Sequence, residues 1–157
     1  MKQIKITTDV TVKTFDELTE IEARLVDLAR QATYRSYVPY SDFHVGAAIL
    51  LDNGEIVTGS NQENAAFPSG TCAERTACFY AGSTYPDARF DSIAISARDA
   101  SGDFVEKPVP PCGACRQALL QYETIARHDV KVILAGRSEL YILPSVKSLL
   151  PLSFTNF

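Results

Sequence analysis

Two short segments of the sequence contain side chains that bind metals. Cys72 lies in Thr-Cys-Ala-Glu-Arg, and Cys112 and Cys115 lie in Pro-Pro-Cys-Gly-Ala-Cys-Arg. Each segment stands where a helix is expected to begin, and helix N-termini stabilise thiolates through their partial positive charge. Side chains three residues apart lie on the same face of a helix, so Cys112 and Cys115 are spaced to bind one metal ion. Three thiolates brought together bind zinc, and we predict a zinc site made by these cysteines.

Three protein ligands leave one zinc position open, which is typical of catalytic sites. Water in that position has a lowered pKa, so hydroxide is available near neutrality. Three thiolates with Zn²⁺ carry a net negative charge that needs compensation. Arg75, three residues after Cys72, is spaced to donate to its thiolate and stabilise it. Glu74 is not needed as a ligand, and we expect it to act as a general acid and base.

The remaining cysteine and the histidines do not fit this site. Cys78 lies about 240° around the helix from Cys72, and we interpret it as a small buried apolar residue. His44 and His128 follow no recurring ligand spacing. Both are interpreted as surface or capping histidines.

The cysteine pair taken alone has other interpretations. Pro-Cys-Gly-Ala-Cys before a helix also fits a redox pair or a closed structural zinc site. The two motifs together, each opening a helix, favour the open zinc site. Metal content and thiol titration distinguish these alternatives.

Composition limits the classes of function. The chain has 157 residues, 46% of them hydrophobic and 22% charged, and a net charge of −4, with a pI of about 5.1. We expect one domain over residues 1–157, with no strong electrostatic binding to nucleic acid or to a membrane. No secretory h-region and no apolar run of about 18 residues is present. The expected location is the cytoplasm, where cysteines serve as metal ligands more often than as disulfides.

Alternating strand and helix patterns indicate an α/β fold with one mixed sheet covered by helices. A Thr-Phe-Asp-Glu capping box at Thr14 and the Asn53-Gly54 hairpin signal are the clearest local markers. The expected strands are 45–51, 56–60, 91–97, 130–135 and 140–143. The expected helices are about 15–34, 71–82, 112–122 and, as a short helix, 145–150. The other segments are an N-terminal arm with an exposed strand (1–13), a long connection (98–111) and a C-terminal tail (151–157).

Several segments resemble the cytidine deaminase family, specifically its small homotetrameric zinc type. The resemblance covers about Leu18–Phe154 and rests on Cys-Ala-Glu and Pro-Cys-Gly-Ala-Cys with Tyr40–Ala48, Asn61–Ala66 and Leu149–Phe154. It implies a single three-layer domain with a mixed five-stranded sheet. It also implies zinc-dependent hydrolysis of free cytidine and 2′-deoxycytidine to uridine and 2′-deoxyuridine with release of ammonia, in pyrimidine salvage.

The resemblance also implies roles for single residues at the base. Cys72, Cys112 and Cys115 bind zinc, and Glu74 moves the proton and donates to N3 of the base. The backbone N–H of Ala73 meets the C2 carbonyl. In addition, the Phe43 ring stacks on the pyrimidine.

Further roles concern the sugar and the assembly. Asn61 and Glu63 hydrogen-bond the ribose 3′-hydroxyl. Phe154 reaches the site of a neighbouring subunit, so the implied homotetramer has its sites at subunit interfaces. A deaminase of a cytosine antibiotic such as blasticidin S is the alternative, against which Asn61 and Glu63 argue.

The sequence departs from the family pattern in three places. Phe67 stands where the family often has tyrosine, so a hydroxyl is missing there. The interval from Cys72 to Cys112 is 112 − 72 = 40 residues, which is long for this type. The excess falls in Ala100–Pro110, where it shapes either the site mouth or a subunit contact. The arm Met1–Lys13 is also additional.

Overall fold

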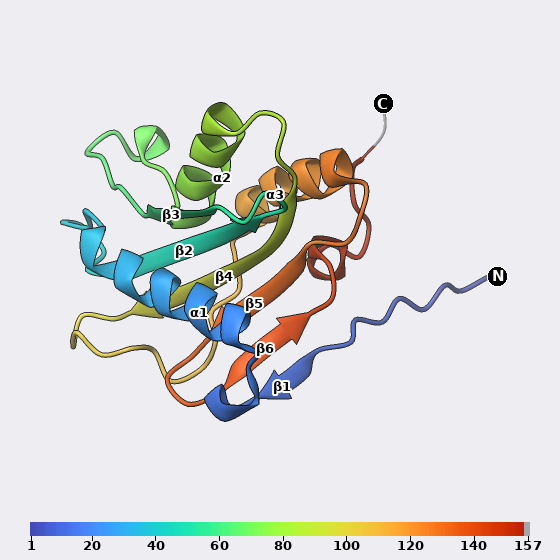
Figure 1. The fold of residues 1–157 in the computed structure, drawn as a ribbon, viewed down its shortest axis with the longest axis horizontal. Helices are drawn as coiled ribbons and strands as arrows, with labels where there is room; N and C mark the ends of the chain where they lie inside the picture. Colours follow the sequence, from blue (N-terminus) through green and yellow to red (C-terminus); the bar gives the residue numbers. More distant parts are fainter. Residues whose placement is uncertain (156–157) are drawn as a thin grey trace.

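A six-stranded mixed sheet forms the centre of the molecule (Figure 1). The structure is a computed structural model that describes residues 1–155. Residues 156 and 157 of the predicted tail lie outside the described residues. The strand order is β1-β6-β5-β4-β2-β3, and β4 and β5 form the parallel pair. The strands are β1 (Thr11–Lys13), β2 (His44–Leu51), β3 (Ile56–Ser60), β4 (Phe90–Arg98), β5 (Lys131–Ala135) and β6 (Leu140–Leu143).

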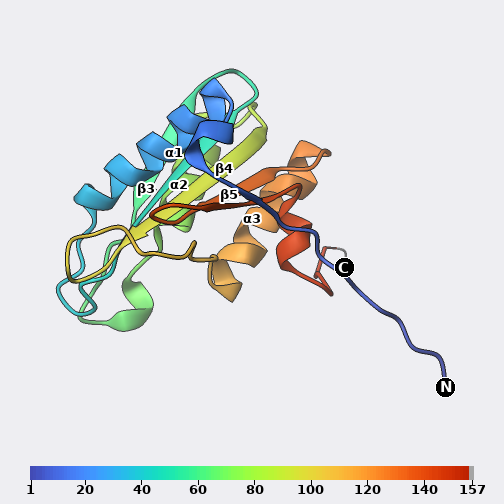
Figure 2. The same ribbon diagram turned by 90° about the horizontal axis from the view of Figure 1, so that it is seen from below.

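Helices cover both faces of this sheet, and Figure 2 shows α1 and α3 on opposite sides of it. The helices are α1 (Glu20–Ala32), α2 (Ala73–Thr84) and α3 (Gly113–Ala126). Successive side chains on β2 point to opposite faces, so Ala47 packs in the core beneath α2 and α3 while Ala48 packs beneath α1. The predicted three-layer α/β architecture is confirmed.

The predicted number of five strands was one too low. The sixth strand is β1, whose residues Thr11–Lys13 pair antiparallel with Leu140–Ile142 of β6. The exposed strand expected in the N-terminal arm therefore joins the edge of the sheet. The first ten residues of the arm are exposed, and Thr8 Oγ1 donates to the Ser148 carbonyl over 2.9 Å before the N-terminus extends away from the body of the molecule (Figure 1).

The first helix begins later than its sequence signal predicted. The Thr14 capping box closes only a 3-10 turn at Phe15–Glu17. A second capping box, in which the Thr19 side chain accepts from the Glu22 N–H, begins α1. Two Thr-x-x-Glu patterns follow each other, and the extended backbone of Leu18 separates the turns that they cap.

Glycines let two helices approach the sheet closely. A Cβ at Gly59 on β3 would lie 2.4 Å from the backbone nitrogen of Ala77 in α2, and one at Gly46 on β2 would lie 2.1 Å from the carbonyl oxygen of Ala29 in α1. The predicted hairpin joins β2 and β3, and Gly54 takes the left-handed conformation in its turn, with φ of 86°. The glycine contacts fix α2 against β3 and so fix the position of its N-terminus.

Candidate metal centre

The three cysteines predicted to bind zinc lie at the N-termini of α2 and α3. Cys72 is the N-cap residue of α2 and Cys112 is the N-cap residue of α3, and neither side chain caps its helix by a hydrogen bond. Cys115 lies in the first turn of α3. The first N–H groups of a helix have no partner within the helix and carry partial positive charge. Both helices therefore direct positive potential toward the sulfur atoms.

The sulfur atoms are close enough to share one metal ion. The three Sγ atoms lie within 4.8 Å of one another, and Cys112 Sγ and Cys115 Sγ are 3.5 Å apart. A tetrahedral zinc with bonds of about 2.3 Å places its sulfur ligands about 3.8 Å apart, so the donor set fits zinc. All four cysteines are free thiols.

Cys78 takes no part in this cluster, as its position on the helix predicted. It packs in the core with Ala77 and Ala81 and is fully buried. Burial raises the pKa of the Cys78 thiol to about 12. Cys78 is therefore neutral and unreactive at physiological pH.

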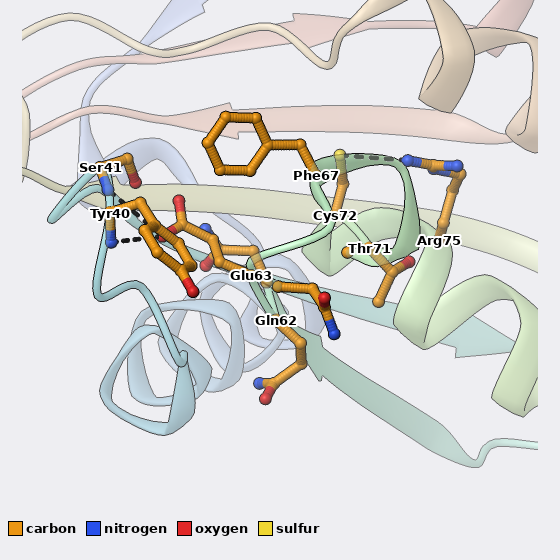
Figure 3. A pocket seen from close by; sticks show the side chains of 11 residues that line it. Tyr40, Ser41, Gln62, Glu63, Phe67, Thr71, Cys72 and Arg75 are labelled. Carbon is orange, nitrogen blue, oxygen red and sulfur yellow. Dashed lines mark hydrogen bonds between the residues drawn. The ribbon is translucent and has the colours of Figure 1, made fainter.

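Arg75 supplies the charged contact at the cluster. Its Nη2 donates to Cys72 Sγ over 3.6 Å (Figure 3). Hydrogen bonds from Cys115 first, and then from Arg75, hold the pKa of Cys72 at about 5, although partial burial opposes them. The same hydrogen bond to Cys72 raises the pKa of Cys115. Within this pair, the thiolate form is therefore favoured at Cys72.

Glu74 lies beside the cysteines in a small cavity. This cavity of about 160 Å³ is lined by Cys72, Glu74 and Cys112 with apolar neighbours. Glu74 is 5% exposed, and burial raises the pKa of its carboxyl group. A buried carboxyl group with a raised pKa is suited to accept and return a proton.

A larger cavity of about 440 Å³ adjoins the small one, because Asn61 and Cys72 line both. Figure 3 shows Tyr40 and Phe67 with Glu63 and Arg75 around this space. The rings of Tyr40 and Phe67 meet edge to face, with centroids 5.7 Å apart. The larger cavity thus offers aromatic surface together with a carboxylate and an amide.

Comparison with known proteins identifies the family. Residues 19–130 match the family model described as "Cytidine and deoxycytidylate deaminase zinc-binding region". The chain belongs to this deaminase family. The zinc of that description and the Cys72, Cys112 and Cys115 cluster identify zinc as the cofactor of this deaminase.

Individual relatives agree with this assignment. The cytidine deaminase of Halalkalibacterium halodurans is 41% identical over 131 residues, which is 83% of this chain and 92% of that protein. The blasticidin-S deaminase of Bacillus cereus is 30% identical over 151 residues, which is 92% of this chain and 99% of that protein. The crystal structure of cytidine deaminase from Burkholderia pseudomallei superposes with a TM-score of 0.73 at 33% identity and covers 87% of this chain and 100% of its own.

Asn61 and Glu63 of this deaminase both line the larger cavity and also hold the backbone around it. Asn61 Oδ1 accepts from the Val45 N–H over 2.8 Å, and Asn61 Nδ2 donates to the Phe43 carbonyl over 2.9 Å. Glu63 Oε2 accepts from the N–H groups of Tyr40 and Ser41. A hydrogen bond from Ser41, with the backbone bonds from Tyr40 and Ser41, lowers the pKa of Glu63.

The three remaining predicted binding residues, Ala73, Phe43 and Phe154, differ in how they lie relative to the site. Ala73 is buried as the first residue of α2, beside the cluster. Phe43 is half-buried and next to Asn61, and Phe154 is 65% exposed, with its carbonyl accepting from Gln117. Neither Phe43 nor Phe154 is among the described residues that line the two cavities.

The sequence patterns assigned no role to some residues that lie near the site. Val109 and Pro110 bring the long 98–111 connection into the small cavity. Arg116 donates to the carbonyl oxygens of Pro111 and Leu149, each over 2.8 Å, and so ties the start of α3 to the C-terminal segment. The position of Arg116 directly after Cys115 was the available signal. Its contact with Leu149 could not be inferred, because the two residues are far apart in sequence. No helix in residues 1–155 is long and apolar enough to span a membrane.

Proposed function

We propose that the protein catalyses hydrolytic deamination of free cytidine and 2′-deoxycytidine, giving uridine or 2′-deoxyuridine and ammonia. The observation that carries this proposal is the small cavity, where buried Glu74 stands beside Cys72 and Cys112 and which adjoins the larger cavity at Asn61. The base would enter the small cavity and the sugar the larger one. Membership of the deaminase family supports the same reaction.

In this proposal, Cys72, Cys112 and Cys115 hold the zinc. When bound, the zinc supplies a Lewis acid that lowers the pKa of water in its open position. Glu74 accepts a proton from the attacking water and donates it to N3 of the base, and then carries the second proton, from the hydroxyl now on C4, to the leaving amine. The raised pKa of Glu74, caused by burial, supports this exchange because the carboxyl group is easily protonated in the cavity.

Recognition of the base falls to neighbouring groups. The N–H of Ala73 belongs to the unpaired first turn of α2 and is free to donate to the C2 carbonyl. Phe43 lies beside Asn61 at the entry to β2, from where its ring would stack on the pyrimidine when substrate binds. Arg75 stabilises the thiolate of Cys72 throughout.

Asn61 and Glu63 would bind the ribose 3′-hydroxyl. Glu63 receives both backbone hydrogen bonds on Oε2, and a carboxylate has further lone pairs with which to accept from the hydroxyl. Asn61 keeps one amide proton and one oxygen lone pair beyond its two backbone bonds. Paired polar groups of this kind reject an analogue that lacks the hydroxyl, since they would remain unsatisfied.

We also propose a cytoplasmic homotetramer in pyrimidine salvage, with each site completed by a neighbouring subunit. Phe154 is 65% exposed and close to α3, to which Gln117 attaches its backbone. A large exposed ring on an attached tail supports the idea that Phe154 enters the site of a neighbour. The remaining exposed aromatic rings near the site, including that of Phe67, offer contact surface.

The proposal is tested by parallel assays of cytidine, 2′-deoxycytidine, 3′-deoxycytidine and blasticidin S, following absorbance loss. Both natural nucleosides should be deaminated, and 3′-deoxycytidine should lose at least about a hundredfold in kcat/KM through Asn61 and Glu63. Blasticidin S is the second candidate substrate because the Bacillus cereus blasticidin-S deaminase matches 92% of this chain. A preference for blasticidin S over cytidine would replace the nucleoside proposal.

A further inference from the structure

His44, the first residue of β2, links two segments beside the larger cavity. Its Nδ1 lies 2.7 Å from Ser36 Oγ, and its Nε2 lies 3.2 Å from Asp42 Oδ1. The His44 side chain is 23% exposed and that of Asp42 is 65% exposed. The expected surface histidine is therefore a half-buried bridge between the end of the first helical segment and the turn before β2.

Hydrogen-bond roles at this bridge determine the form of the ring. Ser36 Oγ donates its single proton to the Thr33 carbonyl over 2.7 Å, so Nδ1 of His44 must donate to Ser36. A carboxylate only accepts, so Nε2 must donate to Asp42. The imidazolium form makes all three hydrogen bonds, whereas the neutral ring forfeits one of them.

Charged groups from three elements face this ring. The carboxylate of Asp42 contacts it directly, and Glu63, on the loop after β3, is near enough for the charge of His44 to affect it. Arg98, directly opposite on β4, is also positive, but its guanidinium donates to the side chain and carbonyl of Thr33 and to the Gly102 carbonyl. Of these groups, Asp42 is the one that hydrogen-bonds the ring directly.

The bridge supports the segment that carries substrate contacts. Asp42 is in the left-handed conformation, with φ of 51°, which is unfavourable for a residue other than glycine. On one side of it, Tyr40 and Ser41 line the larger cavity. On the other side, the Phe43 carbonyl is held by Asn61.

We propose that His44 is a positioning residue whose ring clamps Asp42 to Ser36 and thereby holds the Tyr40–Phe43 segment in place for nucleoside binding. The inference rests on the proposed function, since it assigns the segment to the substrate. Removal of the ring removes the clamp, so nucleoside affinity falls while the chemistry at Glu74 is untouched.

Steady-state kinetics on the zinc-loaded enzyme test this role. Wild type, His44→Gln and His128→Gln are compared with cytidine as substrate. The KM of His44→Gln should lie about fivefold to tenfold above that of wild type and of His128→Gln, the worth of one hydrogen bond to a charged group. The kcat of His44→Gln should be unchanged within about twofold. A KM of His44→Gln that matches wild type overturns the proposal.

Nuclear magnetic resonance of the two histidine rings tests the clamp without relying on activity or on a folded variant. A ring N–H of His44 held by Ser36 or Asp42 should give a proton–nitrogen cross-peak, because both ring nitrogens lie within hydrogen-bond distance of a partner and the ring is part-buried. The exposed His128 is the internal control. Ring protons of His44 that exchange as fast as those of His128 contradict the clamp. If this spectrum is found in a protein that does not deaminate cytidine, the proposed function fails and the clamp stands.

Discussion

At the scale of single residues, the charge around the sulfur atoms sets the chemistry. Three thiolates and one Zn²⁺ leave one negative charge, which makes bound water a weaker acid. The N–H groups of two helix N-termini and the Arg75 guanidinium, 3.6 Å from Cys72 Sγ, oppose that charge. Zinc is assigned from the family and the cysteine cluster, but the balance of charge around it also depends on the helix N-termini and Arg75.

Arg75→Gln should therefore lower kcat about tenfold to a hundredfold, the worth of a charge-assisted hydrogen bond of about 1.5–3 kcal/mol. Zinc should remain bound, because all three sulfur ligands are intact. Turnover and metal content of the same preparation provide the measurement, with Arg24→Gln on the exposed side of α1 as control. Unchanged turnover in zinc-loaded Arg75→Gln would show that the helix N-termini alone balance the charge.

At the scale of elements, the position of α2 against β3 places Cys72 and Glu74. A methyl group at Gly59 would meet Ala77 N at 2.4 Å and Ala73 O at 2.5 Å, which are backbone atoms of α2. Backbone cannot rotate aside as a side chain does. The helix must therefore move away from the sheet to admit any larger residue.

Gly59→Ala should destabilise the protein by about 3 kcal/mol and weaken zinc binding together with activity. Gly113→Ala is the matched control, since a Cβ there meets no atom within 4 Å. Denaturant unfolding and zinc titration of both variants are the measurements. If Gly59→Ala binds zinc as tightly as Gly113→Ala, the close packing does not position the site.

Glu22 joins three elements at the other face of the sheet. It caps α1 and forms ion pairs with Lys13 of β1 and Lys131 of β5, at 3.4 and 3.0 Å. Burial alone would raise its pKa, but the Thr19 N–H and the two lysines outweigh burial and lower the pKa from 4.5 to about 2. A lowered pKa means that the carboxylate stabilises the fold above pH 4.5 and that this contribution disappears as the pH falls toward 2.

Glu22→Gln should accordingly cost about 2 kcal/mol of unfolding free energy at neutral pH, after allowance for screening at the part-exposed lysines. The difference between wild type and variant should shrink as the pH is lowered from about 4.5 to 2. Taking this difference cancels the effect of zinc release in acid, which both proteins share. A difference that is constant with pH would refute the assignment of the lowered pKa to Glu22.

At the scale of the whole molecule, features that depend on neighbours in sequence were predicted better than contacts between residues far apart in sequence. The Asn-Gly hairpin and the two cysteine motifs at helix starts depend on neighbours in sequence, and the structure has these elements where they were expected. The start of α1 was wrong because two adjacent Thr-x-x-Glu patterns compete for it. The attachment of Asn61 to the backbone of Phe43 and Val45 was not predictable, because it depends on how β2 and the loop after β3 meet in space.

The proposed homotetramer makes a prediction about Phe154. If its ring completes a neighbouring site, Phe154→Ala should raise KM for cytidine about tenfold, the worth of burying part of an aromatic ring. Native mass should remain that of four chains, because one ring is a small part of the interface. Light scattering and kinetics on the same sample provide both values. A monomer with wild-type activity would show that no neighbouring subunit contributes to the site.

The most direct test of the central claim is the cytidine turnover of zinc-loaded Glu74→Gln beside wild type. Glutamine fills the same space in the small cavity but cannot carry the proton. One zinc per chain should be found in both proteins, and kcat of the variant should fall on the order of a thousandfold or more. Near-normal turnover with one zinc bound would contradict Glu74 as the proton carrier and the mechanism with it.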